Sequence, residues 1–569
     1  MLILGINAFS HDAAAVFLRD GSVVYAAQEE RFDRRRCSPA FPSHAIEAGL
    51  AHLGIGPSDI DAVAFPWTRG MGRLRKAAYV GLHVPRSLAF LREPPDELVG
   101  TRRGYLKDMG SLERRVREGG IAAAVHRVPH HLAHAASAAL SLPSGSGAVL
   151  TADGMGEWTT AAIWHAIEGL PSRLAEATYP HSPGKVYSAV TAWLGFRPEA
   201  DEGKTMGLAA YGDPGSPGAR FTRSLLRPDA ASLLRVDTRS LDFPMGHARL
   251  FGEAFLAALG PARRPDEPIR PGDADAARGV QDAVEAFALA AARRVLATTH
   301  ASALGLAGGL FLNCALNGRL SRELPVPVHP FPVAGDSGAA LGAAAWLHRR
   351  LTGQCARPIE SLRLGTGIDA AEARRTLAGA DVLELDDATL ARAIANRVAD
   401  GRLVGVARGR AEFGPRALGG RSVLARADDP STRDRLNDHK GRERWRPVAP
   451  VLNEADLDRW FEDPRPSPHM ITTLRVNAAG AAGPLRGAVH ADRTARVQSV
   501  TPTSDPFLSA LLDQTSARGQ PAILDTSLNR RGEPIVNSAA EALEAALAMR
   551  LDTIVIGNRL RDLGPTPTP

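Results

Sequence analysis

Short apolar blocks alternate with polar turns over the first residues of the chain. Three apolar runs are separated by turns in this region: Leu2–Ile6, Ala13–Leu18 and Ser22–Ala27. Apolar runs of this length, bounded by turn residues such as Asp20 and Gly21, are typical of β-strands. The pattern therefore predicts a three-stranded meander.

A similar pattern returns further along the chain. Strand-like runs at Ala148–Thr151 and Thr159–His165 flank a glycine-rich acidic turn at Asp153–Glu157. Two strand-turn-strand units with small or acidic turn residues indicate an internal duplication. We therefore expect a duplicated half-fold whose two loops face a common cleft. Two further glycine-rich stretches, LGLAGGLFLNCALNGRL and PVAGDSGAALGAAAWLHRR, follow a helical stretch at Ala276–His300.

The character of the sequence changes near residue 358. The stretch LTGQCARPIESLRLGTG is typical of a linker, and after it come an amphipathic helix at Ala388–Asp400 and a strand at Leu403–Ala407. A chain of 569 residues is too long for one hydrophobic core. We expect an α/β protein of two domains, residues 1–358 and 359–569, in which Ser216–Asp273 is an insertion or a lid.

Composition and charge exclude several classes of protein. The net charge is +6, but the basic residues are mostly Arg interleaved with Asp and Glu, which favours pockets for small anions over a nucleic-acid surface. The three cysteines are far apart and odd in number, which disfavours disulfides and fits a reducing cytoplasm. We expect no leader and no membrane span, because no apolar run approaches about 18 residues.

Three histidines stand close together in VPHHLAHAASAAL. His130 and His134 are four positions apart, so a helix presents both imidazoles on one face while His131 points elsewhere. Asp153 and Asp336, each in a glycine-rich turn, are the carboxylates that complete a site suited to Fe(II), Mn or Zn. Histidines of a helix surface give the same spacing without a metal. A zinc protease is disfavoured, since the Glu of H-E-x-x-H is missing.

Taken together, the motifs of this chain resemble those of the O-carbamoyltransferases related to the nodulation protein NodU and to the carbamoyltransferases of cephem and aminoglycoside antibiotics, such as the tobramycin enzyme. The matching stretches occur in the family's order over nearly the whole chain: SHDAA, EERF, PHHLAHAASA, DEGKTMGLAAYG, AGGLFLNCALNGRL, GDSGAALGAA, RAEFGPRALGGRSVLA, HKGRERWRPVAP, HADRTARVQSV and LDTSLNRRGEPIV.

The resemblance implies two active sites, one in each domain. The N-terminal domain would be an actin/hexokinase-like, duplicated ribonuclease-H-like fold with iron in its cleft, Fe(II) being favoured over Mn or Zn. The C-terminal domain would be a YrdC-like α/β domain that converts carbamoyl phosphate and Mg-ATP into carbamoyl-adenylate, releasing phosphate and pyrophosphate. Fixed cations must hold these polyanions in one pocket. The residues that match the family's motifs for this task are Arg416, Lys440, Arg446, Arg496, Ser527 and Asn529.

In the first domain the resemblance implies transfer of the carbamoyl group to a hydroxyl. His11, in the first loop, is the expected general base, since an imidazole pKa near 6.5 is close to working pH. The nucleotide, which leaves as AMP, would be held by Lys204, Gly308, Gly309 and Asn313, although Asn313 equally suits a role in securing its turn.

The chain departs from the family at several places. Arg36 stands near the place of a lysine-rich run that follows EERF in many members, and we include it as a further candidate for the site. Arg493 stands where the family usually has Gly, a residue that often marks a positive φ. Ala411 replaces a common Gln or Trp. These departures leave the reaction class unchanged.

Two alternatives remain open to the sequence. One is a carbamoyl or threonylcarbamoyl transferase acting on tRNA or protein, which lacks support because neither a basic stripe nor paired C-x-x-C motifs are visible. The other is a non-catalytic nucleotide-binding regulator, which would not need both the metal cluster and the anion-binding arginines. We expect a small hydroxylated acceptor, no nucleic-acid or membrane partner, and a homodimer as the commonest default. Phe243, Phe251 and Phe255 favour a bulky, partly apolar acceptor, such as a macrolide or its sugar.

Overall fold

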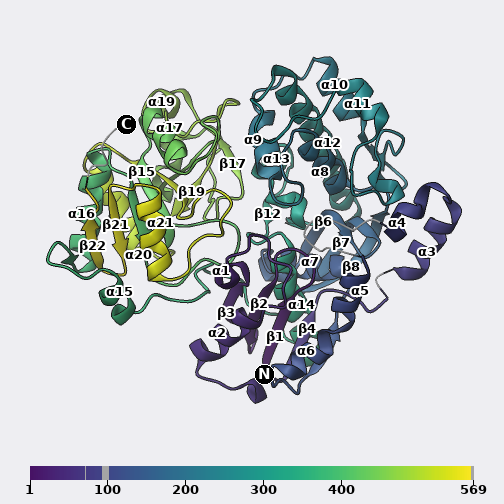
Figure 1. Cartoon of the computed structure of the whole chain (residues 1–569), viewed down its shortest axis with the longest axis horizontal. Coiled ribbons are helices and arrows are strands. Elements are labelled where there is room, and N and C mark those ends of the chain that lie inside the picture. Colours follow the sequence, from purple (N-terminus) through teal and green to yellow (C-terminus); the bar gives the residue numbers. More distant parts are fainter. Residues whose placement is uncertain (71, 93–101, 565–569) are drawn as a thin grey trace. The chain divides into compact units, whose positions relative to one another are not determined.

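The computed structural model describes residues 1–70, 72–92 and 102–564 (Figure 1). By packing, the chain divides into two units, one formed by residues 1–29 and 37–359 and the other by residues 30–36 and 360–569. In the chain, the division falls between Ile359 and Glu360.

The first sheet of the first unit begins with an antiparallel meander. It consists of β1 (Leu2–Asn7), β2 (Ala14–Arg19) and β3 (Ser22–Gln28), in the places where the sequence predicts strands. Two later strands, β4 (Ala62–Phe65) and β5 (Ala124–Arg127), extend the sheet in parallel beyond β1. The strand order is β3-β2-β1-β4-β5.

The second sheet repeats this topology. The meander β6 (Gly147–Gly156), β7 (Thr159–Ile167) and β8 (Leu170–Thr178) is followed by the parallel strands β11 (Leu304–Ala307) and β12 (Val328–Pro330). The order is β12-β11-β6-β7-β8, which places each strand as its counterpart lies in the first sheet. The predicted duplicated, actin/hexokinase-like arrangement is therefore confirmed.

Two helices lie between these sheets and pack closely on each other (Figure 1). The helix α7 (His130–Ala139) follows β5 of the first sheet but packs on β6 and β11 of the second. The helix α14 (Asp336–Thr352) follows β12 of the second sheet and packs on β1, β2 and β4 of the first. Each half of the duplication thus contributes one helix to the other half, and both helices begin at the same end of the sandwich.

The segment Ser216–Asp273 belongs to a helical layer on α12 (Pro271–Thr299). It contains α10 (Pro217–Ser224), the hairpin of β9 (Leu226–Asp229) and β10 (Leu233–Val236), and α11 (Glu253–Leu259). The three phenylalanines by which the sequence favours a partly apolar acceptor are all buried, Phe243 at 4%, Phe251 at 9% and Phe255 at 0% exposure, so none of them offers an open surface to an acceptor. Phe255 is fully buried and packs on the rings of Trp193, Phe221 and Phe251, because α11 turns its apolar face inward. Phe251 is buried with it.

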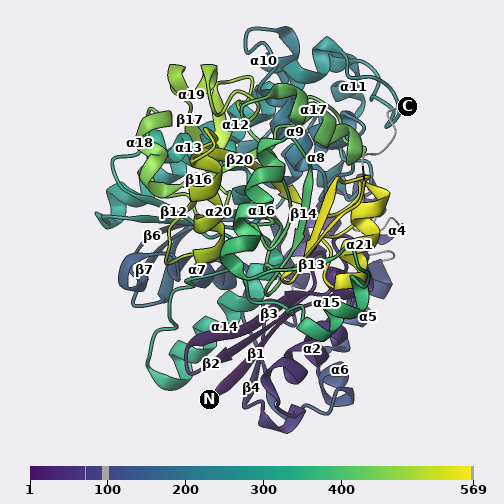
Figure 2. The ribbon, with the colours of Figure 1, turned by 90° about the vertical axis from the view of Figure 1, so that its left-hand side faces the viewer.

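The second unit is built on one mixed sheet, and the predicted α/β class holds for it as well. Helices α16 (Asp387–Ala399) and α20 (Pro506–Ser516) pack side by side against this sheet, as Figure 2 shows, and α21 (Ala539–Ala548) packs on β14 and β21. The order is β13-β22-β21-β14-β15-β20-β16-β19. The strands are β13 (Leu383–Glu384), β14 (Val404–Ala407), β15 (Arg421–Arg426), β16 (Ala449–Asn453), β19 (Gln498–Val500), β20 (Ala522–Ser527), β21 (Thr553–Ile556) and β22 (Arg559–Asp562).

A short N-terminal segment is part of this second unit. Residues 30–36 contain the single-turn helix α1 (Glu30–Asp33), and Arg31 donates to the carbonyl oxygen of Gly414 at 2.7 Å. Arg34 donates to the carbonyl oxygens of Ile535 and Pro534 at 2.9 and 2.8 Å. Charged side chains therefore join the EERF motif to the C-terminal unit. No helix in the described part of the chain combines the length and apolar character that a membrane crossing requires.

Candidate metal centre and cation cluster

The predicted metal ligands come from three elements. His130 and His134 lie one turn apart on α7, which starts directly after Pro129. Asp153 lies on β6 just before its glycine-rich end, and Asp336 is the first residue of α14. A carboxylate at the start of a helix is favoured by the helix dipole. The first half of the duplication thus supplies both imidazoles from α7, and the second half supplies both carboxylates, one from β6 and one from α14.

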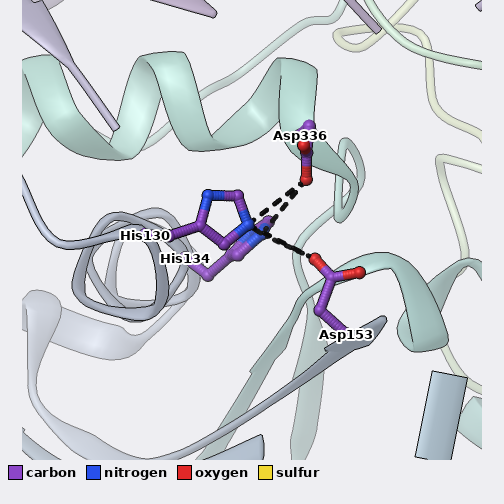
Figure 3. Close-up of side chains that lie close together, drawn as sticks. All are labelled: His130, His134, Asp153 and Asp336. Carbon is purple, nitrogen blue, oxygen red and sulfur yellow. Dashed lines mark hydrogen bonds and ion pairs between the residues drawn. The ribbon is translucent and has the colours of Figure 1, made fainter. Parts of the chain in front are cut away.

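The four side chains converge closely (Figure 3). Nε2 of His134 lies 3.0 Å from Oδ2 of Asp153 and 3.6 Å from Oδ1 of Asp336. Nε2 of His130 lies 3.6 and 3.4 Å from the same two oxygens, and the two Nε2 atoms are 3.1 Å apart. All four residues are buried, His130 and His134 at 1% and 0% exposure. Two nitrogens and two oxygens therefore surround one small volume.

This arrangement fits a divalent cation. Nδ1 of His130 lies 3.2 Å from the carbonyl oxygen of Pro66, an arrangement in which Nδ1–H donates and the Nε2 lone pair points at the site. Within the described residues, Oδ2 of Asp153 is buried and has no hydrogen-bond partner beyond the ion-pair contacts with the two imidazoles. Burial lowers the pKa of His130, but the carboxylates of Asp336 and Asp153 outweigh it and raise that pKa to about 10. The site thus strongly favours positive charge, and a two-histidine, two-carboxylate set suits Fe(II), Mn or Zn.

The third histidine of the motif has a different environment. Nδ1 of His131 lies 2.9 Å from Oγ1 of Thr151, which also accepts a hydrogen bond from Nε1 of Trp164 at 3.0 Å. Burial, reinforced by the charges of His130 and His134, lowers the pKa of His131 to about 3. His131 is therefore a neutral packing residue, and it points away from the four convergent ligands as the helical spacing predicts.

The structure places His11 at the edge of this centre. Nδ1 of His11 lies 3.1 Å from Oδ2 of Asp12, and Nε2 lies 3.9 Å from Oδ2 of Asp336. The amide of Asn7 donates to the carbonyl oxygens of His11 and Asp12 and so fixes the loop. Burial lowers the pKa of His11, but Asp336 and Asp12 raise it well above its usual range. A titratable imidazole thus stands beside the ligands, with a carboxylate that orients its ring.

Gly308 and Gly309, which are predicted to hold the nucleotide, lie against β6, the strand that carries Asp153. Gly308 has φ 102°, and a Cβ there would come 2.2 Å from the carbonyl oxygen of Ala152. A Cβ at Gly309 would come 3.1 Å from Oδ1 of Asp153. Gly308 therefore needs a residue without a side chain, and the pair brings backbone close to the metal centre.

Lys204 and Asn313, the other two residues predicted to hold the nucleotide, each interact with neighbouring side chains. Nζ of Lys204 lies 2.9 Å from Oδ2 of Asp201 and 5.2 Å from the centre of the Phe196 ring. The side chain of Asn313 caps α13 (Cys314–Glu323) by accepting from the backbone N–H of Leu316, and it exchanges hydrogen bonds with Gln281. Asn313 thus secures its turn, one of the two roles that the sequence suggests for it.

Sequence reasoning missed three residues around the metal centre. The indole of Trp67 stacks on the imidazole of His130, with ring centres 4.0 Å apart. Lys185 and Glu199 form a largely buried ion pair. Burial raises the pKa of Glu199, but Lys185 and then His11 lower it below its usual value. A Trp directly after a strand, in FPWTRG, was the only signal for Trp67, and Lys185 and Glu199 follow from tertiary packing alone.

A cluster of cations lies in the second unit, at the ends of β20 and α17 (Pro430–His439). Lys440 is buried; it donates to the carbonyl oxygens of Ser527 and Asn529, and to Oδ1 of Asn529 at 3.1 Å. The hydroxyl of Ser527 donates to the same Oδ1 at 2.5 Å. The structure thus joins three of the predicted residues, Lys440, Ser527 and Asn529, in one network.

The predicted arginines gather around a fourth that the sequence analysis passed over. Arg442 donates to Oγ1 of Thr526 at 3.0 Å. Burial, together with the charges of Arg446, Arg496 and then Arg416, lowers the pKa of Arg442 well below its usual range. Four guanidinium groups and one ammonium gathered in this way are suited to binding a polyanion. The HKGRERWRP motif contains three arginines, and Arg442 was not distinguished from its neighbours there.

Two departures from the family's pattern can also be located. Arg493 has φ 63°, in the left-handed region that favours the Gly of other members. It lies in the turn between His490 and Thr494, next to β18 (Thr494–Arg496). Arg36 is half-buried and belongs to the second unit with the rest of residues 30–36.

Comparison with known proteins identifies the family. Residues 2–345 match the family described as carbamoyltransferase N-terminus, and residues 395–562 match the one described as carbamoyltransferase C-terminus. The chain therefore belongs to the carbamoyltransferase family, and the O-carbamoyltransferases and NodU-related proteins that its motifs resemble are its relatives.

Curated relatives align with nearly the whole chain. The nodulation protein NolNO of Sinorhizobium fredii is 32% identical over 97% of this chain and 79% of its own length. The 3'-hydroxymethylcephem-O-carbamoyltransferase of Amycolatopsis lactamdurans is 28% identical over 98% of both chains. Among solved structures, component A of (R)-2-hydroxyglutaryl-CoA dehydratase from Acidaminococcus fermentans covers 62% of this chain and 98% of its own, with 14% identity and a TM-score of 0.34. The P. abyssi Sua5 complexed with L-threonine covers 31% and 48%, with 17% identity and a TM-score of 0.24.

Proposed function

We propose that this chain is an ATP-dependent O-carbamoyltransferase that modifies a hydroxyl of a small-molecule natural product. Support comes from membership of the carbamoyltransferase family and from a relative named for O-carbamoylation of a hydroxymethylcephem. The observation that carries the proposal is the convergence of His130, His134, Asp153 and Asp336 beside His11. A separate cation cluster in the other unit supplies the second chemical requirement, a polyanion site.

The first step of the proposed reaction makes carbamoyl-adenylate. One carbamoyl phosphate, one Mg-ATP and one water give carbamoyl-adenylate, phosphate and pyrophosphate. Water cleaves the bond between the carbamoyl oxygen and the phosphorus of carbamoyl phosphate, which releases phosphate. The freed carbamate oxygen then forms a bond to the α-phosphorus of ATP, and the bond from that phosphorus to the β-phosphate oxygen breaks, which releases pyrophosphate. Arg416, Arg442, Arg446 and Arg496, with Lys440, would hold the phosphate groups and offset their repulsion. Bound anions would also relieve the mutual repulsion that lowers the pKa of Lys440 and Arg442.

The second step transfers the carbamoyl group at the metal centre. When bound by His130, His134, Asp153 and Asp336, the metal, for which we expect Fe(II) over Mn or Zn, would polarise the carbamoyl oxygen and offset the charge of Asp336 that raises the pKa of His11. His11 would accept the proton of the attacking hydroxyl, and Asp12 would hold the imidazole ring in place. The new bond joins the hydroxyl oxygen to the carbamoyl carbon as the bond from that carbon to the phosphate oxygen breaks, and AMP would leave along the backbone of Gly308 and Gly309.

The acceptor is proposed to be bulky and partly apolar, such as a macrolide or its sugar. Phe243, Phe251 and Phe255 do not support this, since all three are buried. Support comes instead from the rings of Tyr79, Trp158 and Tyr179, which pack together near the metal centre.

The proposal is tested by separating the two steps. Purified protein is given ATP with and without carbamoyl phosphate, in the absence of acceptor, and pyrophosphate is measured. Release that depends on carbamoyl phosphate, and that is lost in Arg442→Ala, supports the first step. Metal analysis of the same preparation then shows whether the site of His130, His134, Asp153 and Asp336 binds a metal ion. A folded protein that binds metal but releases no pyrophosphate under these conditions, even after addition of hydroxylated acceptors, would overturn the proposal.

A further inference from the structure

Five aromatic side chains pack together next to the metal centre. Three come from the segment that contains α3 (Arg73–Leu82) and α4 (Ala89–Arg92). The other two lie directly before β7 and directly after β8. We call Tyr79, His83, Phe90, Trp158 and Tyr179 the aromatic cluster. Tyr79 is at its centre. Its ring lies 5.9 Å from Trp158, 5.5 Å from Tyr179 and 6.3 Å from Phe90, in edge contacts, and stacks on His83 at 4.2 Å.

The aromatic cluster is buried at Tyr179, which we call its base, and half-buried at Tyr79 and Trp158, which we call its rim. Tyr179 is 7% exposed, and its hydroxyl donates to the carbonyl oxygen of Phe243 at 2.5 Å. Gly246, with φ 85°, lets the backbone approach the ring of Phe90. Tyr79 and Trp158 are half-buried. Tyr179 is therefore buried and hydrogen-bonded, whereas Tyr79 and Trp158 leave part of their ring surface exposed.

The rim also carries two polar atoms. Among the described residues, neither the hydroxyl of Tyr79 nor Nε1–H of Trp158 has a hydrogen-bond partner. Burial raises the pKa of Tyr79 to about 12, so its hydroxyl keeps its proton under working conditions. Tyr and Trp combine an apolar ring with a polar tip, a combination suited to ligands that are both apolar and hydroxylated.

The cluster is connected to the metal centre through two short segments. Trp67 stacks on His130, and the next residue, Thr68, donates its backbone N–H to Oε1 of Glu157 at 2.7 Å. On the other segment, a Cβ at Gly156 would come 2.4 Å from Cδ2 of His130. Trp158 lies only two residues beyond Gly156. The aromatic rim therefore begins within a few residues of the site where the carbamoyl group would be transferred.

The N-terminus of α3 completes this connection. A Cβ at Gly72, which precedes the helix with φ 67°, would come 3.2 Å from Cβ of Trp158. The close approach fixes α3, and with it Tyr79, against the turn that leads from the metal ligand Asp153.

We propose that the aromatic cluster binds the acceptor, and that the acceptor carries an apolar ring or chain next to the hydroxyl that is carbamoylated. This inference rests on the proposed function. Trp158 and Tyr79 contact the apolar part of the acceptor, and their polar tips donate to its oxygens. It is a specificity determinant for the transfer step and takes no part in adenylate formation.

The test compares three probes as acceptors: octyl β-D-glucopyranoside, methyl β-D-glucopyranoside and an aminoglycoside. Full-length protein, loaded with Fe(II), is given ATP and carbamoyl phosphate, and carbamoylated product is measured by mass spectrometry. Transfer rates are divided by the pyrophosphate release of the same preparation. We expect kcat/KM for the octyl glycoside to exceed that for the methyl glycoside at least tenfold. Trp158→Ala and Tyr79→Ala should raise KM for the octyl glycoside about tenfold with little change in kcat.

Two further variants separate binding from folding. Tyr79→Phe removes only the hydroxyl and should raise KM about threefold. Leu82→Ala, on the same helix but with an 83% exposed side chain, should be unchanged. The inference is overturned if the two glycosides react equally, if the aminoglycoside is preferred, if neither glycoside reacts, or if Trp158→Ala and Tyr79→Ala leave KM unaltered. In each of these cases pyrophosphate release that depends on carbamoyl phosphate would still support the proposed function, and its absence would remove both.

Discussion

Gly342 on α14 lies directly against the carbonyl oxygen of Ala133 on α7, so that a Cβ at Gly342 would come 1.9 Å from that oxygen. The two helices therefore touch backbone to backbone. One carries His130 and His134, and the other begins at Asp336. Since each helix packs on a different sheet, this contact sets the distance between metal ligands that belong to the two halves of the duplication.

Gly342→Ala should weaken both the fold and the metal centre. The added methyl group must push the helices apart, and overpacking of this kind costs about 1–3 kcal/mol. We expect a lower free energy of unfolding and weaker metal binding, measured by denaturant titration and by metal analysis after dialysis. Gly272→Ala is the matched control, because a Cβ there meets nothing within 4 Å. A Gly342→Ala protein with unchanged stability and metal content would show that the helices can separate without cost.

Asp153→Asn should remove the metal without unfolding the protein. The substitution keeps the size of the side chain but takes away one of the two carboxylates around the imidazoles. Metal content, measured by inductively coupled plasma mass spectrometry, should fall from about one per chain to a small fraction. His165→Gln, on β7, serves as the control and should keep its metal. Full occupancy in Asp153→Asn would mean that the metal binds elsewhere.

His11→Asn should impair transfer and spare adenylate formation. General base catalysis typically contributes about 10²–10⁴-fold to a rate. We expect carbamoyl transfer to an active acceptor to slow by a factor in that range, while pyrophosphate release that depends on carbamoyl phosphate stays within about twofold of the unmodified protein. Equal losses in both assays would contradict the role of His11 as a base for the acceptor hydroxyl.

Pyrophosphate should stabilise the protein through Lys440, and the effect should depend on pH. Burial and the charges of Arg442 and Arg446 lower the pKa of Lys440 well below 10.5, so the folded state holds its proton less tightly than the unfolded state. The resulting stability cost is complete below the lowered pKa and disappears as the pH rises toward 10.5. A bound anion offsets this cost. We expect pyrophosphate to raise the melting temperature at pH 7, by less as the pH rises, and by less in Lys440→Met.

Much of the fold and of the metal centre could be predicted because the signals are local. The spacing of His130 and His134, and the glycine-rich turns around Asp153 and Asp336, are visible in short stretches of sequence. The repeated strand-turn-strand pattern likewise predicts the duplication. These features depend on helix and strand periods, which a sequence records directly.

The features that could not be predicted depend on tertiary packing. Phe255 and Tyr79 are both aromatic residues near helices, yet one is sealed in a helical layer and the other forms part of a half-buried rim. The pairing of Lys185 with Glu199 joins residues whose approach depends on how a loop folds back. Arg442 differs from neighbouring arginines only in where its side chain points. Composition carries no information on these directions.

The central claim is that adenylate formation and carbamoyl transfer occur at two separate sites. Its most direct test is pyrophosphate release without acceptor in three proteins: the unmodified chain, Arg442→Ala and Asp153→Asn. The account predicts release that requires carbamoyl phosphate in the unmodified chain, that persists in Asp153→Asn, and that is abolished in Arg442→Ala. Release that does not need carbamoyl phosphate, or that disappears with the metal ligand while Arg442→Ala retains it, would contradict the account.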